Sequence, residues 1–111
     1  MDFESALKYL ETLISHERDR DFLYDEKNFD LDRFRRVVAD FEVAYSGLKI
    51  VHVAGSKGKG SVCNFISEYL VGIGERVGLF TSPHLYDIRE RIRVNGEMIS
   101  CERFGEYVGM V

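Results

Sequence analysis

The feature that most constrains this chain is a glycine-rich turn at residues 54–61, which separates two segments of different periodicity. Before the turn, residues 50–53 are β-branched and mostly apolar, as is typical of a strand buried in a parallel sheet. After the turn, apolar residues recur at helical spacing until Gly72 and Gly74 interrupt the pattern. Residues 76–80 then predict a second strand. The order strand, glycine turn, helix and strand predicts a βαβ unit, and with it an α/β fold with a parallel sheet.

Local signals predict two helices before this unit. Residues 3–14 repeat apolar side chains at helical spacing, and Asp2 is placed to favour a helix N-terminus. Asp30 can cap a second helix, which should end before the break at residues 45–47. The polar and charge-rich residues 16–29 between the two helices predict a surface loop.

A β-hairpin is predicted towards the end of the chain. Asn95 and Gly96 lie between residues 91–94 and 97–99, and this dipeptide is the strongest short-range hairpin signal. Both central residues of a type I′ turn need positive φ, which asparagine and glycine tolerate. Residues 104–111 repeat apolar side chains again, which predicts a further helix.

Composition narrows the possible functions. The formal net charge of -4, with basic and acidic residues interleaved, gives no basic stripe for a phosphate backbone, so nucleic acid is not expected as a partner. The longest apolar stretches fall far short of the roughly 20 residues of a membrane span, so no membrane is expected. The sequence starts without a secretory signal pattern, which predicts a cytoplasmic protein. Cys63 and Cys101 lack zinc-site spacing and are expected to be reduced thiols.

The glycine turn has the sequence context of a phosphate-binding loop, because it joins a predicted strand to a predicted helix. Glycines 55, 58 and 60 let the backbone pass close to phosphate oxygens and turn several N–H groups inward. Lys59 supplies a mobile cation for the β- and γ-phosphates and is the candidate catalytic residue. Ser61 can donate its hydroxyl to a phosphate oxygen.

The turn departs from the Walker pattern at two positions. Val53 occupies the place of the first glycine, and Gly60 follows the lysine where a Mg²⁺-binding hydroxyl usually stands. A glycine-rich turn without a ligand is the alternative interpretation. The Gly-Lys-Gly-Ser context favours a mononucleotide site.

A second group of candidate residues, Thr81-Ser-Pro-His84, follows the second predicted strand. Open parallel sheets bind ligands at the carboxyl ends of their strands, so this turn should face the same crevice as the glycine turn. Taken alone, a Ser-Pro-His turn is more often a plain loop, and His84 more often a structural residue. His52 lies inside the first predicted strand and is expected to be buried.

Three motifs in order resemble those of folylpolyglutamate and dihydrofolate synthases, which belong to the Mur ligase superfamily. They are residues 52–61 (HVAGSKGKGS), 78–85 (GLFTSPHL) and 90–96 (ERIRVNG). The resemblance covers almost the whole chain and implies a three-layer, P-loop-type parallel sheet with flanking helices. The family usually has Thr-Asn where this chain has Ser56 and Lys57, so Lys57 places a second cation in the loop.

The resemblance implies roles for individual residues. The nucleotide-binding residues would be Gly55, Ser56, Lys57, Gly58, Lys59, Gly60 and Ser61. Ser82 would be a Mg²⁺ ligand, and His84, Arg89 and Arg91 would be substrate residues. Residues 85–93 would lie near the pterin-bearing substrate, where Arg89 and Arg91 could meet a carboxylate. The alternative is that Asp87, Arg89, Glu90 and Arg91 pair with one another on a solvated face.

The implied activity is that of an ATP-dependent ligase that joins L-glutamate to a folate or dihydropteroate carboxylate through an acyl phosphate, with ATP and Mg²⁺ as cofactors. Residues 1–111 would be the N-terminal part of the ATP-binding domain, with the rest of that domain and a glutamate-binding C-terminal domain beyond Val111. The chain alone is expected to be inactive and to self-associate through an exposed sheet edge. Two alternatives remain: a non-catalytic nucleotide-binding fragment, and another Mur-type ligase or a P-loop kinase.

Overall fold

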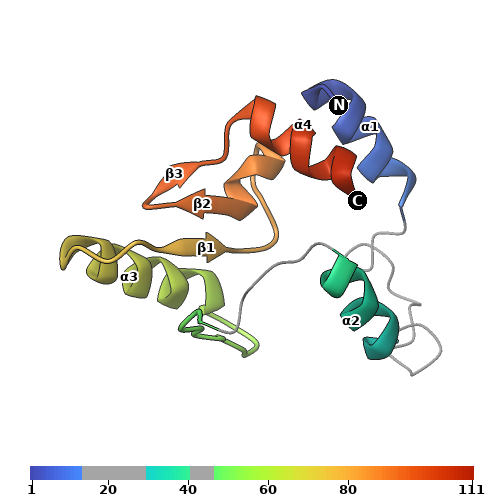
Figure 1. Ribbon diagram of the computed structural model, residues 1–111. Helices are drawn as coiled ribbons and strands as arrows, with labels where there is room; N and C mark the ends of the chain where they lie inside the picture. The colour runs from blue at the N-terminus through green and yellow to red at the C-terminus, as the bar shows by residue number, and fades with distance from the viewer. Residues whose placement is uncertain (14–29, 41–46) are drawn as a thin grey trace. The chain divides into compact units, whose positions relative to one another are not determined.

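The computed structural model describes residues 1–13, 30–40 and 47–111, which fall into two units (Figure 1). Unit 1 comprises Met1–Ser15 and Val53–Val111, and unit 2 comprises His16–His52. The described elements are α1 (Phe3–Thr12), α2 (Leu31–Asp40), α3 (Lys59–Gly72), β1 (Gly78–Phe80), the 3-10 helix η1 (Ile88–Arg91), β2 (Ile92–Val94), β3 (Glu97–Met98) and α4 (Cys101–Met110). The mixture of helices and strands confirms the predicted α/β class.

Unit 1 is organised around a three-stranded antiparallel sheet in the order β1-β2-β3. Arg93 is at its centre, opposite Leu79 on one side and Met98 on the other. Helix α3 packs against β1, η1 contacts β2 and β3, and α1 packs against α4. Figure 1 shows α3 lying along β1, with the start of the helix and the end of the strand at the same end.

Helices α1 and α2 begin where the sequence predicts, because Asp2 and Asp30 bind their first N–H groups. Helix α4 begins at Cys101, three residues before the predicted range of 104–111. An oxygen of Asp2 accepts from Ser5 N at 2.9 Å at the start of α1. In unit 2, one oxygen of Asp30 accepts from the backbone N–H groups of Asp32 and Arg33 at 2.9 and 3.0 Å. Ser100 caps α4 through Arg103 N at 3.2 Å.

The predicted hairpin is confirmed at Asn95 and Gly96, whose φ angles are 51° and 83°. Both values are positive, as a type I′ turn requires. Asn95 also reaches the residue before β1: its side chain accepts from Val77 N at 2.8 Å, and its own N–H donates to Val77 O at 2.8 Å. The turn therefore closes the hairpin and also fixes its register against β1.

The strand predicted at residues 50–53 was wrong, and so was the burial expected for His52. Residues 48–55 have no regular secondary structure, and His52 is exposed. Hydropathy can indicate an apolar extended segment, but a strand also needs a hydrogen-bonded neighbour. In the part of the chain that the structure describes, every strand pairing is antiparallel, so the predicted parallel sheet is not seen there. The predicted loop at residues 16–29 lies outside the described residues.

The contact between α1 and α4 holds the hydrophobic residues that the described part of unit 1 buries most completely. Ala6 is 0% exposed and Phe104 is 4% exposed. The ring of Phe104 meets that of Phe3 edge to face, with centroids 5.5 Å apart. Gly105 lies against the N-terminus, where an added Cβ would overlap the carbonyl oxygen of Met1. The two helices approach closely because this position has no side chain.

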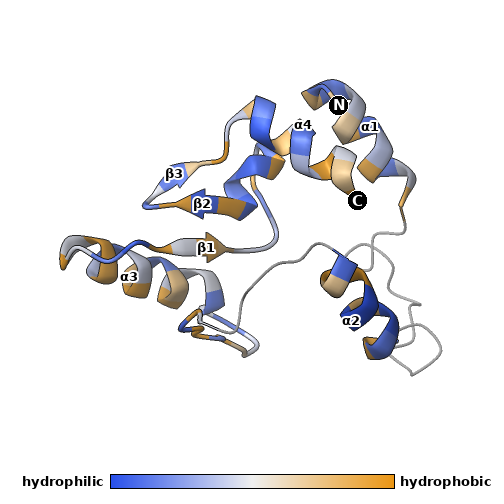
Figure 2. Ribbon diagram, viewed as in Figure 1, coloured by the Kyte–Doolittle hydropathy of each residue, from blue (hydrophilic) through white to orange (hydrophobic). Residues whose placement is uncertain are grey.

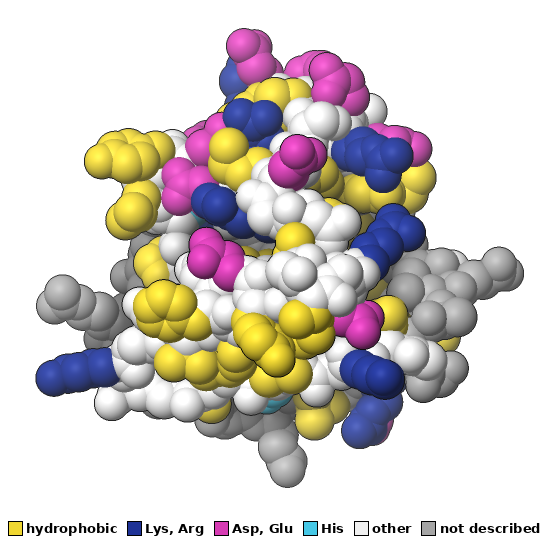
Figure 3. All heavy atoms as spheres, turned by 90° about the vertical axis from the view of Figure 1, so that its left-hand side faces the viewer, with side chains coloured by type: hydrophobic (Ala, Val, Ile, Leu, Met, Phe, Trp, Pro, Cys, Tyr) yellow, Lys and Arg dark blue, Asp and Glu magenta, His cyan; other side chains and the backbone are white. Residues whose placement is uncertain are grey.

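By contrast, α3 leaves a large apolar surface uncovered. Phe65 and Tyr69, one helical turn apart, are 72% and 69% exposed. Figure 2 shows hydrophobic residues along α3, and Figure 3 shows hydrophobic side chains gathered on the face that lies at the left of Figure 1. Exposed apolar area of this extent is typical of an interaction surface. No helix within residues 1–13, 30–40 and 47–111 has the length and apolar character needed to cross a membrane.

Gly105→Ala should destabilise the chain by about 1–3 kcal/mol, because the added methyl overlaps backbone and forces α1 away from α4. The matched control is Gly72→Ala, since a Cβ on this last residue of α3 meets no atom within 4 Å. The control should be neutral or more stable by about 0.5–1 kcal/mol. Urea unfolding followed by circular dichroism measures both changes. Equal stability of the two variants would contradict the assigned helix contact.

The isolated chain should be marginally stable or should self-associate, because its described core is small and its apolar surface large. Sedimentation should therefore show concentration-dependent association, and calorimetry a broad transition. Phe65→Gln should reduce association without loss of helix, since this side chain is exposed. A wild-type chain that is monomeric and melts cooperatively would contradict this expectation.

Candidate functional site

The glycine turn ends at the N-terminus of α3, where Gly58 is the N-cap residue in a left-handed conformation with φ of 73°. A residue with a Cβ adopts this conformation at a cost, which explains the glycine. The Gly58 carbonyl accepts from Val62 N at 3.0 Å and so begins the helix. Among the described residues no side chain caps the first N–H groups of α3. These groups and the helix dipole are therefore available to an anion.

Lys59 folds back over the turn that precedes it. Its Nζ donates to the carbonyl oxygen of Gly55 at 2.6 Å, which closes the turn through one side chain. At the start of the helix, Asn64 donates to the Gly60 carbonyl at 2.8 Å. The other predicted nucleotide-binding residues, Ser56, Lys57 and Ser61, are exposed. The structure thus brings all seven predicted residues into one turn with two lysine cations and a helix N-terminus.

The second predicted segment begins at the same end of unit 1, because α3 and β1 pack side by side in opposite directions. Thr81 N donates to the Arg91 carbonyl at 3.0 Å, which extends the β1-β2 pairing by one step. Ser82 follows, with a cis peptide bond to Pro83. Ser82 is exposed, and no described residue hydrogen-bonds its hydroxyl.

His84 and Arg91, two of the predicted substrate residues, contact each other. The Nε of Arg91 donates to Nδ1 of His84 at 2.8 Å, and both side chains are half-buried. This bond fixes the orientation of the imidazole ring and leaves Nε2 as its other polar atom. Their proximity could not be read from the sequence, because they are seven positions apart and meet only through the fold of the loop.

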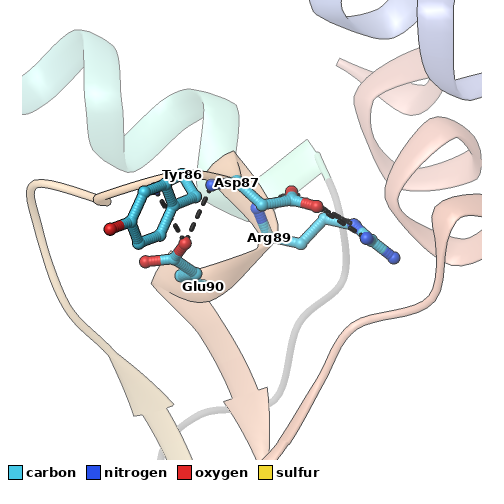
Figure 4. Close-up of polar contacts among 4 residues, drawn as sticks. All are labelled: Tyr86, Asp87, Arg89 and Glu90. Carbon is cyan, nitrogen blue, oxygen red and sulfur yellow. Dashed lines mark hydrogen bonds and ion pairs between the residues drawn. The ribbon is translucent and has the colours of Figure 1, made fainter.

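Arg89, the third predicted substrate residue, is bound within the protein. Its guanidinium makes two-point contact with Asp87, with Nη2 at 2.6 Å and Nε at 3.0 Å from the same carboxylate oxygen (Figure 4). It also lies over the Phe3 ring, 5.3 Å from the centroid. The Arg89 hydrogen bond lowers the pKa of Asp87, and Asp87 in turn raises the pKa of Arg89. The alternative that these two residues pair is therefore confirmed.

Glu90 is a site residue whose role was not predicted from the sequence. Its carboxylate accepts from three consecutive backbone N–H groups: that of Leu85 at 3.0 Å, and those of Tyr86 at 2.9 Å and Asp87 at 2.8 Å. Figure 4 shows the bonds from Tyr86 and Asp87. The sequence does contain a signal for this role. Asp87 and Glu90 have the three-residue spacing of a capping box, and they form one at the start of η1. These backbone bonds, that from Leu85 first, lower the pKa of Glu90.

The described residues can contribute to a metal site but do not complete one. They contain no group of three or more His, Cys, Asp or Glu side chains that could hold an ion. Mg²⁺ bound to a nucleotide keeps several waters and phosphate oxygens and takes only one or two protein oxygens. The hydroxyl of Ser82 fits such a partial role, since it is an exposed oxygen ligand of the required type.

Comparisons with known proteins agree on one family. No protein-family model matches the chain. The chain is 43% identical over 110 residues to a folylpolyglutamate synthase of Arabidopsis thaliana. The matched region covers 95% of this chain and 17% of that enzyme. The chain therefore spans about a sixth of the length of this curated relative. The resemblance to folylpolyglutamate synthases is confirmed over almost the whole sequence.

Solved structures of the same kind superpose on the chain. A bifunctional folylpolyglutamate synthase/dihydrofolate synthase with manganese, AMPPNP and L-glutamate bound is 30% identical, with a TM-score of 0.77 over 99% of this chain and 24% of that one. The folylpolyglutamate synthase of Thermotoga maritima is 34% identical, with a TM-score of 0.77 over 97% of this chain and 23% of that one. The fold seen here is thus shared with ligases of this family.

Glu90 should make stability depend on pH in a defined direction. Its pKa is lowered below the ordinary value of 4.5 by folding, so the stabilisation is present above that value. It should decline as the pH falls from 4.5 through the lowered pKa. The stability difference between the wild type and Glu90→Gln should therefore shrink over this range, as urea unfolding at several pH values can measure. A difference that stays constant down to about pH 3 would contradict the assigned hydrogen bonds.

Proposed function

We propose that this chain is part of a folylpolyglutamate synthase and supplies the ATP-phosphate site of an ATP-dependent ligase. The enzyme would join L-glutamate to the carboxylate of a folate or dihydropteroate. The observation that carries the proposal is the left-handed Gly58 cap at the start of α3, with Lys59 folded over the same turn. The similarity to a relative that binds AMPPNP and manganese supports it.

The turn can bind phosphate through backbone and charge together. The first N–H groups of α3 point out of its N-terminus and carry the positive end of the helix dipole. Lys59 would give up its hydrogen bond to the neutral Gly55 carbonyl oxygen and bind a charged phosphate oxygen in its place. Gly55, Ser56, Lys57, Gly60 and Ser61 would line the same phosphates.

The proposed reaction has two steps. A carboxylate oxygen of the folate attacks the γ-phosphorus of ATP, the bond to the bridging oxygen breaks, and ADP leaves. The amine of glutamate then attacks the carbonyl carbon of the acyl phosphate, loses a proton and expels inorganic phosphate, which forms the amide. Lys59 would offset the negative charge that develops during the first step. Bound Mg²⁺ would neutralise charge on the phosphate oxygens, with the Ser82 hydroxyl as a protein ligand.

His84, Arg89 and Arg91 are proposed to lie near the substrate carboxylate. His84 and Arg91 are already joined by one hydrogen bond and would act as a pair. Arg89 would have to share its guanidinium with Asp87. The whole enzyme is proposed to have a three-layer, P-loop-type parallel sheet with flanking helices.

A second candidate is nucleotide binding without chemistry. It is favoured for the isolated chain because the chain spans 17% of its Arabidopsis relative and its described residues form no complete metal site. Binding of nucleotide without release of ADP or phosphate would support this candidate for the isolated chain.

Titration of the chain with Mg-ATP should show binding that Lys59→Ala weakens by about 10–100-fold, the range for one charge-assisted hydrogen bond. Ser82→Ala should bind nucleotide but lose its dependence on Mg²⁺. Lys8→Ala is the matched control, since this exposed lysine lies on α1. Isothermal calorimetry measures the dissociation constant of the nucleotide for the wild type and the three variants, with and without Mg²⁺. A folded wild-type chain that binds no nucleotide, or a Lys59→Ala variant that binds equally well, would contradict the proposal.

A further inference from the structure

Residues 81–87 form a loop that two consecutive residues of η1 hold in place. The Arg91 carbonyl accepts from Thr81 N at 3.0 Å, and the Arg91 side chain donates to His84 at 2.8 Å. Glu90 accepts the next three backbone N–H groups, from residues 85, 86 and 87, at 2.8–3.0 Å. The loop is therefore attached to η1 on both sides of Ser82.

Glu90 provides three of these attachments, and its charge strengthens them. Hydrogen bonds to an ionised acceptor are roughly twice as strong as those between neutral groups. Both carboxylate oxygens are used, one for Leu85 and the other for Tyr86 and Asp87. Both oxygens of Glu90 are thus engaged by the loop backbone, so Glu90 is a poor candidate for a metal ligand, although it is an acidic residue that binds the same loop as Ser82.

Ser82 differs from its neighbours in the loop. No described residue hydrogen-bonds its hydroxyl, whereas Thr81 and His84 on either side are both held. Mg²⁺ demands near-ideal octahedral geometry at about 2.0–2.1 Å, so a hydroxyl ligand must be placed accurately. A loop fixed on both sides of Ser82 meets this requirement without restraining the hydroxyl itself.

We propose that Glu90 is a positioning residue, which fixes the backbone of residues 81–87 so that Ser82 presents its hydroxyl to the metal ion of a bound nucleotide. This inference rests on the proposed function, because it takes Ser82 as the metal ligand. Glu90 acts through the backbone and touches neither metal nor nucleotide. Substitution of Glu90 should therefore weaken metal binding and leave the phosphate site at α3 intact.

The test compares Glu90→Ala and Glu90→Gln in the same chain, with Glu106→Ala on the exposed face of α4 as the matched control. Two dissociation constants are measured: that of AMPPNP without metal, and that of Mn²⁺ at saturating AMPPNP, from the Mn²⁺ electron paramagnetic resonance signal. Glu90→Ala should raise the Mn²⁺ constant by about 10–100-fold, the usual effect of losing a residue that orients a metal ligand. Its metal-free AMPPNP constant should stay within about twofold of the wild type. Glu90→Gln keeps one acceptor oxygen, so its Mn²⁺ dissociation constant should lie between those of the wild type and Glu90→Ala.

A Glu90→Ala variant that binds Mn²⁺ as the wild type does would overturn the inference. Loss of metal-free AMPPNP binding in the same variant would also overturn it, because Glu90 would then support the whole unit. A wild-type chain that binds no AMPPNP contradicts the proposed function. In that case amide hydrogen exchange of the wild type and of Glu90→Ala tests whether Glu90 fixes the loop. Faster exchange at residues 85–87, with a shifted amide resonance for Ser82, supports the positioning role. Unchanged exchange and an unchanged Ser82 resonance overturn it.

Discussion

Strand β1 is the element that joins α3 to the sheet and brings the two candidate functional segments to one end of unit 1. It pairs with β2 along one edge, and α3 packs against it. The short connection between α3 and β1 makes the two run in opposite directions, so the start of the helix and the end of the strand lie together. The glycine turn and the Thr81–His84 segment are extensions of these two ends. Their proximity therefore follows from one packing contact and one ladder of hydrogen bonds.

The two functional segments use backbone N–H groups in opposite ways. At the start of α3 the described residues leave the first N–H groups uncapped, so their partial positive charge is available to a ligand. At residues 85–87 three N–H groups also converge, but Glu90 fills the position that an anion would take. The first arrangement suits binding and the second suits rigidity. The Glu90 carboxylate thus occupies the N–H groups of residues 85–87, whereas the N–H groups at the start of α3 are open to a phosphate.

Local features of the fold could be predicted from the sequence, and features that depend on distant partners could not. Asp2 and Asp30 cap their helices, and Asn95-Gly96 makes its turn, because each acts within a few residues. Residues 50–53 were mistaken for a strand because their hydropathy says nothing of a hydrogen-bonding neighbour. The turn before α3 was predicted for the same local reason as the caps, because its glycines lie next to one another in the sequence. The contacts of Arg89 with Phe3 and of Arg91 with His84 needed the folded chain.

The claim that residues 58–61 and 82 act on one nucleotide is tested most directly by nuclear magnetic resonance. AMPPNP would be added to the uniformly nitrogen-labelled chain, first with Mg²⁺ and then with paramagnetic Mn²⁺. We predict that Mg²⁺-AMPPNP shifts the amides of residues 55–61, and that Mn²⁺ broadens those amides together with Ser82 and His84. Broadening confined to acidic residues elsewhere, or shifts that avoid the start of α3, would contradict the account.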